Sequence, residues 1–236
     1  MPEYEPAVKA AALKALELVH DGARVGLGSG HAASAFIDLL GVRVREGLRV
    51  SGVPTSQAAA AEAGQAGIPI IALGDGVRLD LTVDGADEVA PNLDLVKGWG
   101  GAFVRERIVA RASKRQVIIV GAEKLVRALG EHGRIPLEVI PLARSLATAE
   151  LAALGLVPTL RTDARGALPL ITDNGNVVID CAPPAPLRNG AAARAMERTL
   201  LNVIGVVDTG LFLGTAERVL VGHPDGRVET LRRPEA

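Results

Sequence analysis

The chain has 236 residues, of which 48% are hydrophobic and 22% are charged, a composition that supports a buried core and argues against disorder. Its 26 basic and 27 acidic residues nearly cancel, so no strong field exists to gather nucleic acid or an anionic membrane. Aromatic residues make up only 2%, which excludes a stacking platform for single-stranded bases. An anionic ligand is therefore expected to be held locally, by a few placed groups.

The cysteine and histidine content restricts the possible metal sites. The single cysteine, Cys181, excludes an internal disulfide and a zinc site of the Cys/His type. The four histidines are far apart in the sequence and form no local metal motif. Residues 1–19 combine early acidic residues with lysines inside an apolar pattern, which is typical neither of a signal peptide nor of a membrane span. We expect a cytoplasmic, soluble protein without a membrane partner.

The first half of the chain alternates between predicted strands and predicted helices. Apolar residues at helical spacing predict helices over residues 7–19, 32–40 and 57–66. Short apolar runs predict strands over residues 23–27, 49–53, 70–73, 79–83 and 116–120. This alternation indicates a parallel sheet with helices on both faces, in which ligands bind beyond the carboxyl ends of the strands. The loops that begin at Gly28, Thr55 and Asp84 each follow a predicted strand, so parallel strands would bring these three loops to the same edge.

The pattern changes from about residue 135. Strands are predicted over residues 135–140, 157–161, 168–172 and 176–180, and helices over 143–154 and 191–201. The Asn174-Gly175 pair is a strong hairpin signal. Further strands, over residues 206–213, 218–222 and 227–231, are expected to return to the first domain. We therefore expect an α/β catalytic domain of residues 1–130 and 205–236, and an inserted α+β domain of residues 131–204.

A glycine-rich segment, Gly28-Ser29-Gly30, joins the first strand to the following helix. Glycines let the backbone turn tightly, and the N–H groups at a helix start can face a bound anion. The same segment also suits a turn with only a folding role, and both interpretations stay open. After the next strand, Thr55 and Ser56 offer hydroxyls to a ligand, and Ser56 is also a suitable N-cap for the helix over residues 57–66.

Two acidic residues, Asp84 and Asp87, lie three positions apart where a predicted strand ends, and Gly85 permits a turn between them. If both face a cleft, proximity and desolvation will separate their pKa values, which suits proton transfer to and from sugar hydroxyls. The alternative is an exposed acidic turn that Glu88 extends.

Lys97 follows an apolar run and precedes three glycines, Gly98, Gly100 and Gly101. A lysine in this place can stabilise a developing oxyanion, and backbone N–H groups of the glycines can reach the same atom. The alternatives are a strand-end lysine paired with a carboxylate and a loop with unusual dihedral angles.

Glu106 lies in or near the first turn of a helix that is predicted to end at about residue 112. It suits a general base if it faces a cleft. The alternative is a surface glutamate that complements the helix dipole, and the pattern does not tell which way it faces.

Several segments together resemble ribose-5-phosphate isomerases of the A type. They are VDGADE, KGWGG followed by RE at a helix start, GLGSG, VPTS, IPLEVIP, TDNGNVVIDC and GVVDTGLFLG. The likeness spans nearly the whole chain in the order of the family. It implies a Rossmann-like, doubly wound, mostly parallel sheet with a smaller inserted ferredoxin-like domain, and a homodimer or homotetramer.

The resemblance also implies a reaction and roles for residues. The reaction is the interconversion of D-ribose 5-phosphate and D-ribulose 5-phosphate through a cis-enediolate, without metal or other cofactor, in the non-oxidative branch of the pentose phosphate pathway. Glu106 would move the proton between C2 and C1, and Asp84 would assist ring opening and hydroxyl proton transfer. Asp87 and Lys97 would position the sugar, and Lys97 with the glycine backbone would stabilise the enediolate. The residues implied to contact substrate elsewhere are Ser29, Lys124 and, by a loose match, Lys9.

The chain departs from the family pattern at the predicted phosphate loop. The family commonly has GTGST where this chain has Gly28-Ser29-Gly30-His31-Ala32, so two hydroxyls are missing after Gly30. Either charged His31 replaces one hydroxyl as a phosphate donor, or His31 is an exposed helix-start residue and backbone N–H groups suffice. Gly121 also stands where an aspartate is common. His31 and Ala32 leave open an isomerase of a different sugar phosphate on the same fold. A non-catalytic sugar-phosphate sensing domain is the other alternative, because related folds serve in transcriptional regulators. The complete acid–lysine–base set argues against it, since a sensor would not need that set.

Overall fold

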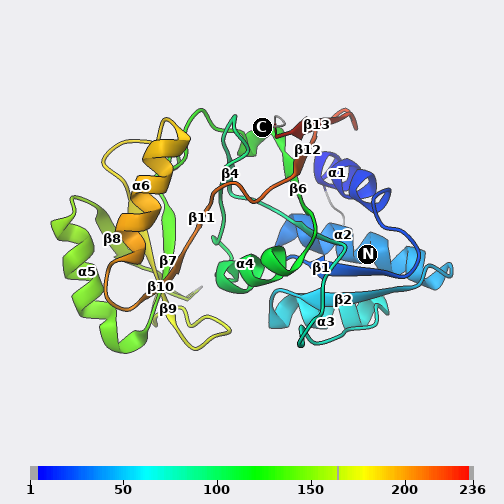
Figure 1. The fold of residues 1–236 in the computed structure, drawn as a ribbon, viewed down its shortest axis with the longest axis horizontal. Helices are drawn as coiled ribbons and strands as arrows, with labels where there is room; N and C mark the ends of the chain where they lie inside the picture. Colours follow the sequence, from blue (N-terminus) through cyan, green and yellow to red (C-terminus); the bar gives the residue numbers. More distant parts are fainter. Residues whose placement is uncertain (1–4, 164, 234–236) are drawn as a thin grey trace. The chain divides into compact units, whose positions relative to one another are not determined.

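The computed structural model describes residues 5–163 and 165–233 (Figure 1). Within them the chain forms two compact units. Unit 1 runs up to Ala86 and adds Arg105–Lys124 and the residues from Thr215, whereas unit 2 comprises Asp87–Val104 and Leu125–Gly214. Unit 2 thus takes in more of the chain than the inserted range 131–204, and the boundaries of independently folding domains stay a prediction. Among the described residues, no helix has the length and apolar character needed to cross a membrane.

Unit 1 is built on a six-stranded sheet in the described part of the chain, in the order β13-β12-β6-β3-β1-β2. Its strands are β1 (Ala23–Leu27), β2 (Val50–Pro54), β3 (Leu81–Asp84), β6 (Gln116–Gly121), β12 (Arg218–Gly222) and β13 (Val228–Arg232). Every pair of neighbours is parallel except β12 and β13. The register places Gly26 of β1 beside Val53 on one side and Thr82 on the other. The predicted parallel sheet is confirmed, and the carboxyl ends of its five parallel strands therefore meet at one edge.

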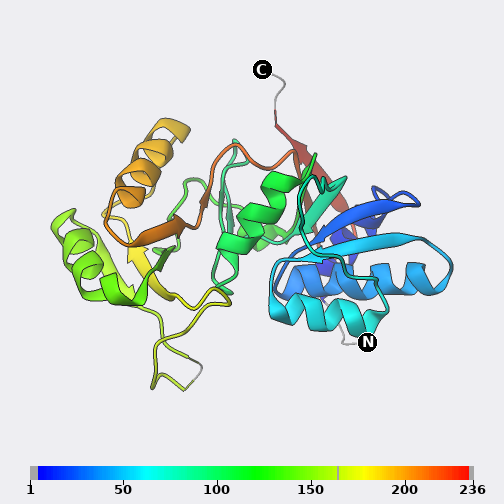
Figure 2. The same ribbon diagram turned by 60° about the horizontal axis from the view of Figure 1, so that its bottom comes forward.

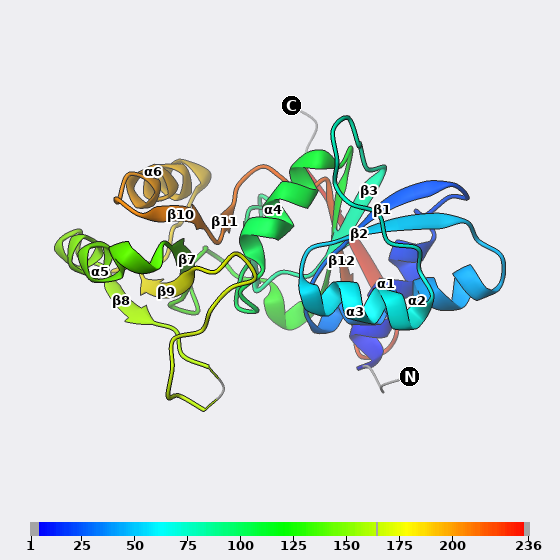
Figure 3. The ribbon, with the colours of Figure 1, turned by 90° about the horizontal axis from the view of Figure 1, so that it is seen from below.

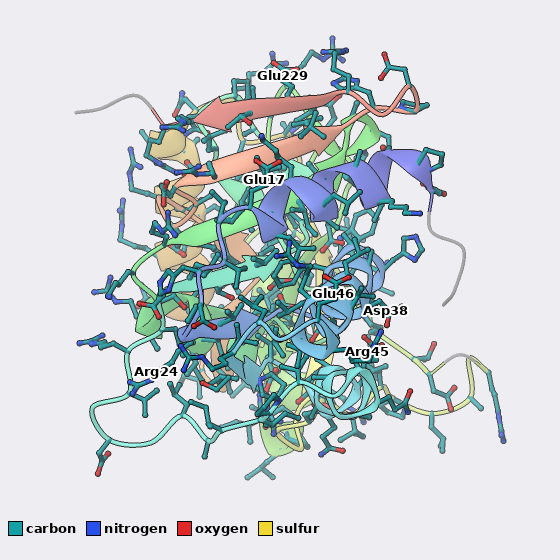
Figure 4. All side chains as sticks on the ribbon, turned by 90° about the vertical axis from the view of Figure 1, so that its right-hand side faces the viewer. Glu17, Arg24, Asp38, Arg45, Glu46 and Glu229 are labelled. Atoms are coloured by element: carbon teal, nitrogen blue, oxygen red, sulfur yellow. The ribbon has the colours of Figure 1, made fainter. Side chains whose placement is uncertain are left out.

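Helices cover both faces of this sheet. On one face, α1 (Pro6–Leu16), α2 (His31–Arg45) and α3 (Gln57–Ala66) bury their apolar residues in the main core. On the other, Val109 of α4 (Phe103–Ala112) packs with Val53 and Leu79 in a separate cluster, and Figure 3 shows α4 opposite α2 and α3. Figure 4 labels Glu17 directly after α1, and Arg45 and Glu46 at the end of α2, and all three residues are exposed. This pattern of apolar inner and charged outer positions is what amphipathic periodicity predicts.

Two predicted strands were wrong because the chain there cannot continue a ladder. Residues 70–73 contribute a single bridge, Gly52 to Ile70, at the outer side of β2. Pro69 has no N–H to donate, and the exposed side chain of Ile70 gains little from pairing. Residues 168–172 likewise form isolated bridges only, from Thr162 to Pro169 and from Ile171 to Val177, in the described structure. The Asn174-Gly175 turn itself is present, with φ of 80° at Gly175.

Unit 2 contains a four-stranded antiparallel sheet in the order β10-β7-β9-β8. Its strands are β7 (Ile135–Val139), β8 (Val157–Leu160), β9 (Val177–Ala182) and β10 (Val206–Thr209). Figures 1 and 2 show α5 (Arg144–Ala153) and α6 (Gly190–Leu201) on the same face of this sheet. The unit is thus an α+β unit, as the sequence predicted, and both helices lie on one side of its sheet.

Unit 2 also contains a small three-stranded sheet in the order β11-β5-β4, and Lys97 directly follows its central strand. Its strands are β4 (Glu88–Val89), β5 (Leu95–Val96) and β11 (Leu211–Phe212). The prediction of one strand over residues 206–213 that returns to the first domain was wrong, because β10 pairs with β7 and β11 pairs with β5, both in unit 2. The break falls at Gly210, where an added Cβ would lie 2.2 Å from the carbonyl oxygen of Lys97. Glycine is therefore required for this close approach.

Candidate active site

Loops at the carboxyl edge of the unit 1 sheet bring together hydroxyl and carboxylate groups from three strands. Ser29 follows β1, Thr55 and Ser56 follow β2, and Asp84 ends β3. The Ser29 hydroxyl lies 2.7 Å from the hydroxyls of both Thr55 and Ser56. The Ser29 N–H donates to Oδ1 of Asp84 at 3.3 Å. The predicted convergence of these three loops in unit 1 is confirmed.

Asp84 is held firmly at this edge. Its side chain is 1% exposed, and Oδ1 also accepts a hydrogen bond from the N–H of Gly85 at 2.8 Å. A Cβ added at Gly28 would lie 2.2 Å from the same oxygen and 2.7 Å from the Asp84 Cα. The glycine at position 28 is thus required because the carboxylate packs directly against its backbone. An exposed acidic turn is excluded for Asp84.

The start of α2 forms the next part of the edge. Gly30 is the N-cap residue, with φ of 91°, and glycine has no side chain that could accept from the first turn. His31 is the first helical residue and is exposed. Ser56, in contrast, caps α3 as predicted, with its oxygen accepting from the Ala59 N–H at 3.0 Å. The N–H groups at the start of α2 therefore have no N-cap side chain as an acceptor. The same arrangement is seen at helix ends that bind anions.

Two predicted lysines also belong to unit 1. Lys124 ends the short 3₁₀ helix η1 (Ala122–Lys124) after β6 and is partly buried. Lys9 is exposed on α1, two residues after Ala7. The Ala7 carbonyl approaches the carboxyl end of β12 so closely that a Cβ at Gly222 would lie 1.9 Å from it. The part of α1 that carries Lys9 is therefore next to the same sheet edge.

Glu106 lies in the first turn of α4, as predicted. Its side chain is 5% exposed, so the alternative of a solvated surface glutamate does not hold. A carboxylate at a helix start benefits from the positive end of the helix dipole. Burial of such a group is typical of a functional or a paired carboxylate.

Asp87 and Lys97 belong to unit 2. The Asp87 N–H donates to the carbonyl of Val96 at 2.8 Å, and its Oδ2 accepts from the Trp99 N–H at 2.9 Å. Lys97 is 3% exposed, directly after β5, and its Nζ lies 5.6 Å from the ring centre of Phe212. A contact with an aromatic face offsets part of the cost of burying an ammonium group, and a charge in a low-dielectric setting acts strongly on nearby anions.

The glycine loop, which we define as Gly98–Gly101, follows Lys97. Gly98 and Gly101 have φ of 107° and 84°, so the predicted unusual dihedral angles are present at these two positions. A Cβ at Gly98 would also lie 2.5 Å from the ring of Phe103. The Gly98 carbonyl accepts from the Gly101 N–H at 3.0 Å. The loop is thus a tight turn that a bulkier residue at position 98 would open.

Sequence reasoning missed the side chains that hold the glycine loop and its neighbours. Arg161 donates to the carbonyls of Gly98 and Trp99, and Asp180 binds its guanidinium. Glu88 is fully buried, so it does not extend an exposed acidic turn, which was the alternative interpretation of this segment. Its carboxylate accepts hydrogen bonds from the N–H groups of Gly130 and His132 at 2.6 and 2.8 Å. Arg161 and Asp180 are 19 positions apart, and the other contacts join residues 42 to 63 positions apart, so no local sequence pattern predicts them. A buried charged residue inside an otherwise apolar strand is the one signal that points to such a role.

Cys181 is next to Asp180 in β9 and is buried. Burial, and to a smaller extent the charge of Asp180, raises the pKa of its thiol to about 12. The thiol therefore stays protonated at neutral pH and is unsuited to nucleophilic chemistry. Across residues 5–163 and 165–233, no three His, Cys, Asp or Glu side chains are grouped so that they could hold a metal ion.

The fold of unit 1 is that of an α/β protein with buried polar groups at the carboxyl edge of its parallel sheet, which is where proteins of this class commonly bind small ligands. The model of the family described as ribose 5-phosphate isomerase A (phosphoriboisomerase A) matches residues 51–226. The chain therefore belongs to the ribose 5-phosphate isomerase A family.

Similar proteins support this assignment over nearly the full length. The ribose-5-phosphate isomerase A of Deinococcus radiodurans is 45% identical over 232 residues, which cover 98% of this chain and 100% of the relative. That of Gloeobacter violaceus is 45% identical and covers 94% of both chains. Among solved structures, ribose 5-phosphate isomerase A from Methanocaldococcus jannaschii has a TM-score of 0.88 and 40% identity, covering 96% of this chain and 98% of its own. A D-ribose-5-phosphate isomerase in complex with phospho-erythronic acid has a TM-score of 0.91 and 37% identity, covering 98% of this chain and 100% of its own.

Proposed function

We propose that this chain interconverts D-ribose 5-phosphate and D-ribulose 5-phosphate through a cis-enediolate, without a metal ion, as a step of the pentose phosphate pathway. Family membership supports the reaction. The observation that carries the proposal for this chain is the burial of Asp84, Lys97 and Glu106, which are 1%, 3% and 5% exposed. Burial of ionisable groups costs free energy, and such groups concentrate at functional sites.

Glu106 is proposed as the general base that carries the proton between C2 and C1. A general base must be ionised and aimed at the carbon-bound proton. Its place in the first turn of α4 supports the ionised form, because the helix dipole favours a negative charge there. The same carboxyl group then returns the proton to the neighbouring carbon.

Asp84 is proposed to assist ring opening and to transfer protons to and from the sugar hydroxyls. The N–H groups of Ser29 and Gly85 share one of its oxygens, Oδ1, which fixes the carboxylate in place. A fixed carboxylate exchanges a proton with a bound hydroxyl without first reorganising. Asp87, which accepts from the Trp99 N–H, is proposed to position the sugar together with Lys97.

Lys97 and the backbone N–H groups of the glycine loop are proposed to stabilise the enediolate. Negative charge develops on the oxygens of C1 and C2 as the proton leaves carbon. A buried ammonium and preorganised N–H donors stabilise such charge at the moment it forms, and each typically contributes a factor of about 10² to 10³ in rate. Lys97 thereby supplies the electrostatic role that a cation would otherwise fill.

The phosphate is proposed to bind beside Gly28, Ser29 and Gly30, with the N–H groups of the first turn of α2 as backbone donors and His31 as a side-chain donor. The N–H groups of Gly28 and Ser29 themselves donate to the Val83 carbonyl and to Asp84. Lys124 and Lys9 are proposed to contact the substrate from neighbouring loops of the same edge. The uncapped character of Gly30 supports this, because the N–H groups of the first helical turn suit an anion. The Ser29 hydroxyl lies within hydrogen-bond distance of Thr55 and Ser56 and is thus fixed in orientation.

A different sugar phosphate is the second candidate, because His31 and Ala32 stand where the family commonly has hydroxyls. A panel of four-, five- and six-carbon aldose phosphates separates the two candidates. The highest kcat/KM is expected for ribose 5-phosphate, and a higher value for another sugar would favour the second candidate.

We also propose a cytoplasmic location and a homodimer or homotetramer. Apolar side chains on the surface of unit 2 support association: Leu142 is 95% exposed and Ile204 is 67% exposed. Exposed apolar side chains that form a contiguous patch commonly mark a subunit contact. Light scattering of the purified protein decides the oligomeric state, and a monomer at micromolar concentration would rule out the dimer and the tetramer.

The reaction is tested by measuring ribulose 5-phosphate formation from ribose 5-phosphate with the purified protein. We expect the same rate with and without a metal chelator. If the folded protein shows no turnover, the proposed activity is wrong. If a chelator removes the activity, the metal-independent mechanism is wrong although the activity stands.

A further inference from the structure

The guanidinium of Arg161 joins the glycine loop to the antiparallel sheet of unit 2. Arg161 follows β8 directly, and its backbone N–H donates to the carbonyl of Val178 in β9 at 2.9 Å. Its Nη1 donates to two carbonyls of the loop region, those of Gly98 at 2.8 Å and Trp99 at 3.0 Å. The side chain is 8% exposed. Arg161, at the end of a strand, thus binds the backbone carbonyls of two successive residues, Gly98 and Trp99.

Asp180 holds the other side of the same guanidinium. Its two carboxylate oxygens accept from Nε, at 2.8 Å, and from Nη2 of Arg161. All three nitrogens of Arg161 therefore have partners, which offsets the cost of burying the charge. The fork geometry is specific to arginine, since the single ammonium of a lysine cannot reach Asp180 and both loop carbonyls at once.

The contact between Arg161 and the Gly98 carbonyl also affects Asp87, because the peptide unit between Gly98 and Trp99 is planar. The Gly98 carbonyl and the Trp99 N–H belong to one trans peptide unit and point in opposite directions. The carbonyl accepts from Arg161, and the N–H donates to Oδ2 of Asp87 at 2.9 Å. One peptide unit therefore connects the Arg161 guanidinium to the Asp87 carboxylate.

The next peptide unit is oriented by the same contact. The Trp99 carbonyl faces Arg161, so the N–H of Gly100 points away from it. A positive charge at a carbonyl oxygen also polarises the peptide and strengthens its N–H as a donor. Arg161 thus sets both the direction and the donor strength of N–H groups in the glycine loop.

We propose that Arg161, clamped by Asp180, is a positioning residue for the isomerisation, acting through Asp87 and the glycine loop. This inference rests on the proposed function, in which Asp87 positions the sugar and the loop N–H groups stabilise the enediolate. Arg161 itself touches no reacting atom. Its contribution appears mainly in the transition state, because charge on the enediolate oxygens develops only there.

The test compares Arg161→Lys with the control Arg134→Lys. Arg134 also lies beside Asp180, with Nε 3.1 Å from Oδ1, and over the Trp99 ring at 5.3 Å, but no contact with the loop carbonyls is found for it in the described structure. For Arg161→Lys we expect kcat to fall about 10- to 100-fold and KM to change less than about three-fold. For Arg134→Lys we expect kcat within about three-fold of the parent.

Inhibition by phospho-erythronic acid supplies a readout that a purely structural role would not change. The carboxylate of this acid carries negative charge on two oxygens, as the enediolate does. We expect Arg161→Lys to weaken inhibition about ten-fold or more while KM for ribose 5-phosphate stays within about three-fold. An unchanged kcat and an unchanged inhibition constant in folded Arg161→Lys would overturn the proposal.

A second variant covers the case in which Arg161→Lys does not fold. Asp180→Asn keeps the guanidinium and both loop carbonyls but weakens the clamp, so the same selective loss in kcat is expected, at about three- to ten-fold. Parent-like kcat in folded Asp180→Asn would then overturn the proposal. The parent protein is measured in the same assay: if the parent has no isomerase activity, the proposed function fails, whereas an active parent with unaffected variants defeats only the role of Arg161.

Discussion

The carboxyl edge of unit 1 and the glycine loop of unit 2 hold their functional groups by different means. At the edge, Ser29, Thr55 and Asp84 follow neighbouring parallel strands, so the regular sheet alone brings them together. In the loop, Trp99 and the flanking glycines are held by side chains from other segments: Asp87 accepts from the Trp99 N–H, and Arg161 comes from a strand end 62 residues away. Regular backbone thus positions the first set, and a few side-chain contacts position the second.

This difference predicts how each region responds to substitution. The edge is supported by many backbone hydrogen bonds, so a damaging change there must act on the packing between adjacent loops. The glycine loop has few supports, so changes in its dihedral angles or in its carbonyl contacts should act on catalysis directly.

The largest effect is expected for Glu106→Gln, which keeps the shape of the side chain but cannot accept the carbon-bound proton. We expect kcat to fall by a factor of about 10³ or more with little change in substrate affinity, because general base catalysis typically contributes 10² to 10⁴. Isothermal titration and a coupled turnover assay measure the two quantities. Glu46→Gln, on the outer surface of α2, is the matched control and should behave as the parent. Near-full turnover of Glu106→Gln would show that another group is the base.

In the glycine loop, Gly98→Ala and Gly100→Ala form a matched pair. Gly98 has φ of 107°, and an added Cβ would lie 2.5 Å from the Phe103 ring, whereas a Cβ at Gly100 meets no described atom within 4 Å. For Gly98→Ala we expect a loss of about 1–3 kcal/mol in the free energy of unfolding and a fall in kcat of at least about ten-fold. Gly100→Ala should keep the parent stability. Chemical denaturation and steady-state kinetics test both, and equal behaviour of the pair would contradict the tight-turn account.

At the edge of unit 1, Gly28→Ala tests the packing between neighbouring loops. The added Cβ would lie 2.7 Å from the Asp84 Cα, so either β1 or β3 must move at its end. We expect a loss of about 1–3 kcal/mol in the free energy of unfolding, together with a smaller fall in kcat than for Glu106→Gln. Gly64→Ala in α3, where the added Cβ meets no described atom within 4 Å, is the control and should not destabilise the protein. A stable, fully active Gly28→Ala variant would refute the close contact.

The smallest effect is expected at the exposed Asp21–Arg49 ion pair, far from the carboxyl ends of the strands. Hydrogen bonds from Arg49 lower the pKa of Asp21 from 3.8 to about 2. Since the folded-state pKa is depressed, the stabilisation is present above about pH 4 and is lost as the pH falls through about 2. Asp21→Asn should therefore lower Tm slightly at pH 6, and the difference from the parent should shrink towards pH 2. A difference that grows on acidification would have the wrong sign.

Much of unit 1 could be predicted from the sequence because its signals are local. The helix over residues 57–66, its Ser56 cap and the strand over residues 218–222 agree with the structure in full. Strand alternation then predicted the parallel sheet, and the parallel sheet predicted the convergence of Ser29, Thr55 and Asp84. Each step needs only the residues of one element and a general rule of sheet topology.

What could not be predicted depends on contacts between distant residues. Residues 70–73 have the composition of a strand, but Pro69 and an exposed edge position limit the pairing to a single bridge. The division of residues 206–213 between two sheets follows from the approach of Gly210 to the Lys97 backbone, which no local pattern shows. The hydrogen bonds from Arg161 to the glycine loop are likewise contacts between distant residues that no local pattern shows. The roles of the individual site residues remain predictions until they are tested by substitution.

Solvent deuterium incorporation tests the cis-enediolate account most directly. The parent protein is incubated with ribose 5-phosphate in D₂O that contains a chelator, and the ribulose 5-phosphate formed is examined by NMR. Because Glu106 would hold the proton on an oxygen between its removal from C2 and its return to C1, that proton can exchange with solvent. We predict deuterium at C1 of ribulose 5-phosphate from the parent and no such product from Glu106→Gln. Ribulose 5-phosphate that forms without any deuterium, as in a direct hydride shift, would contradict the account.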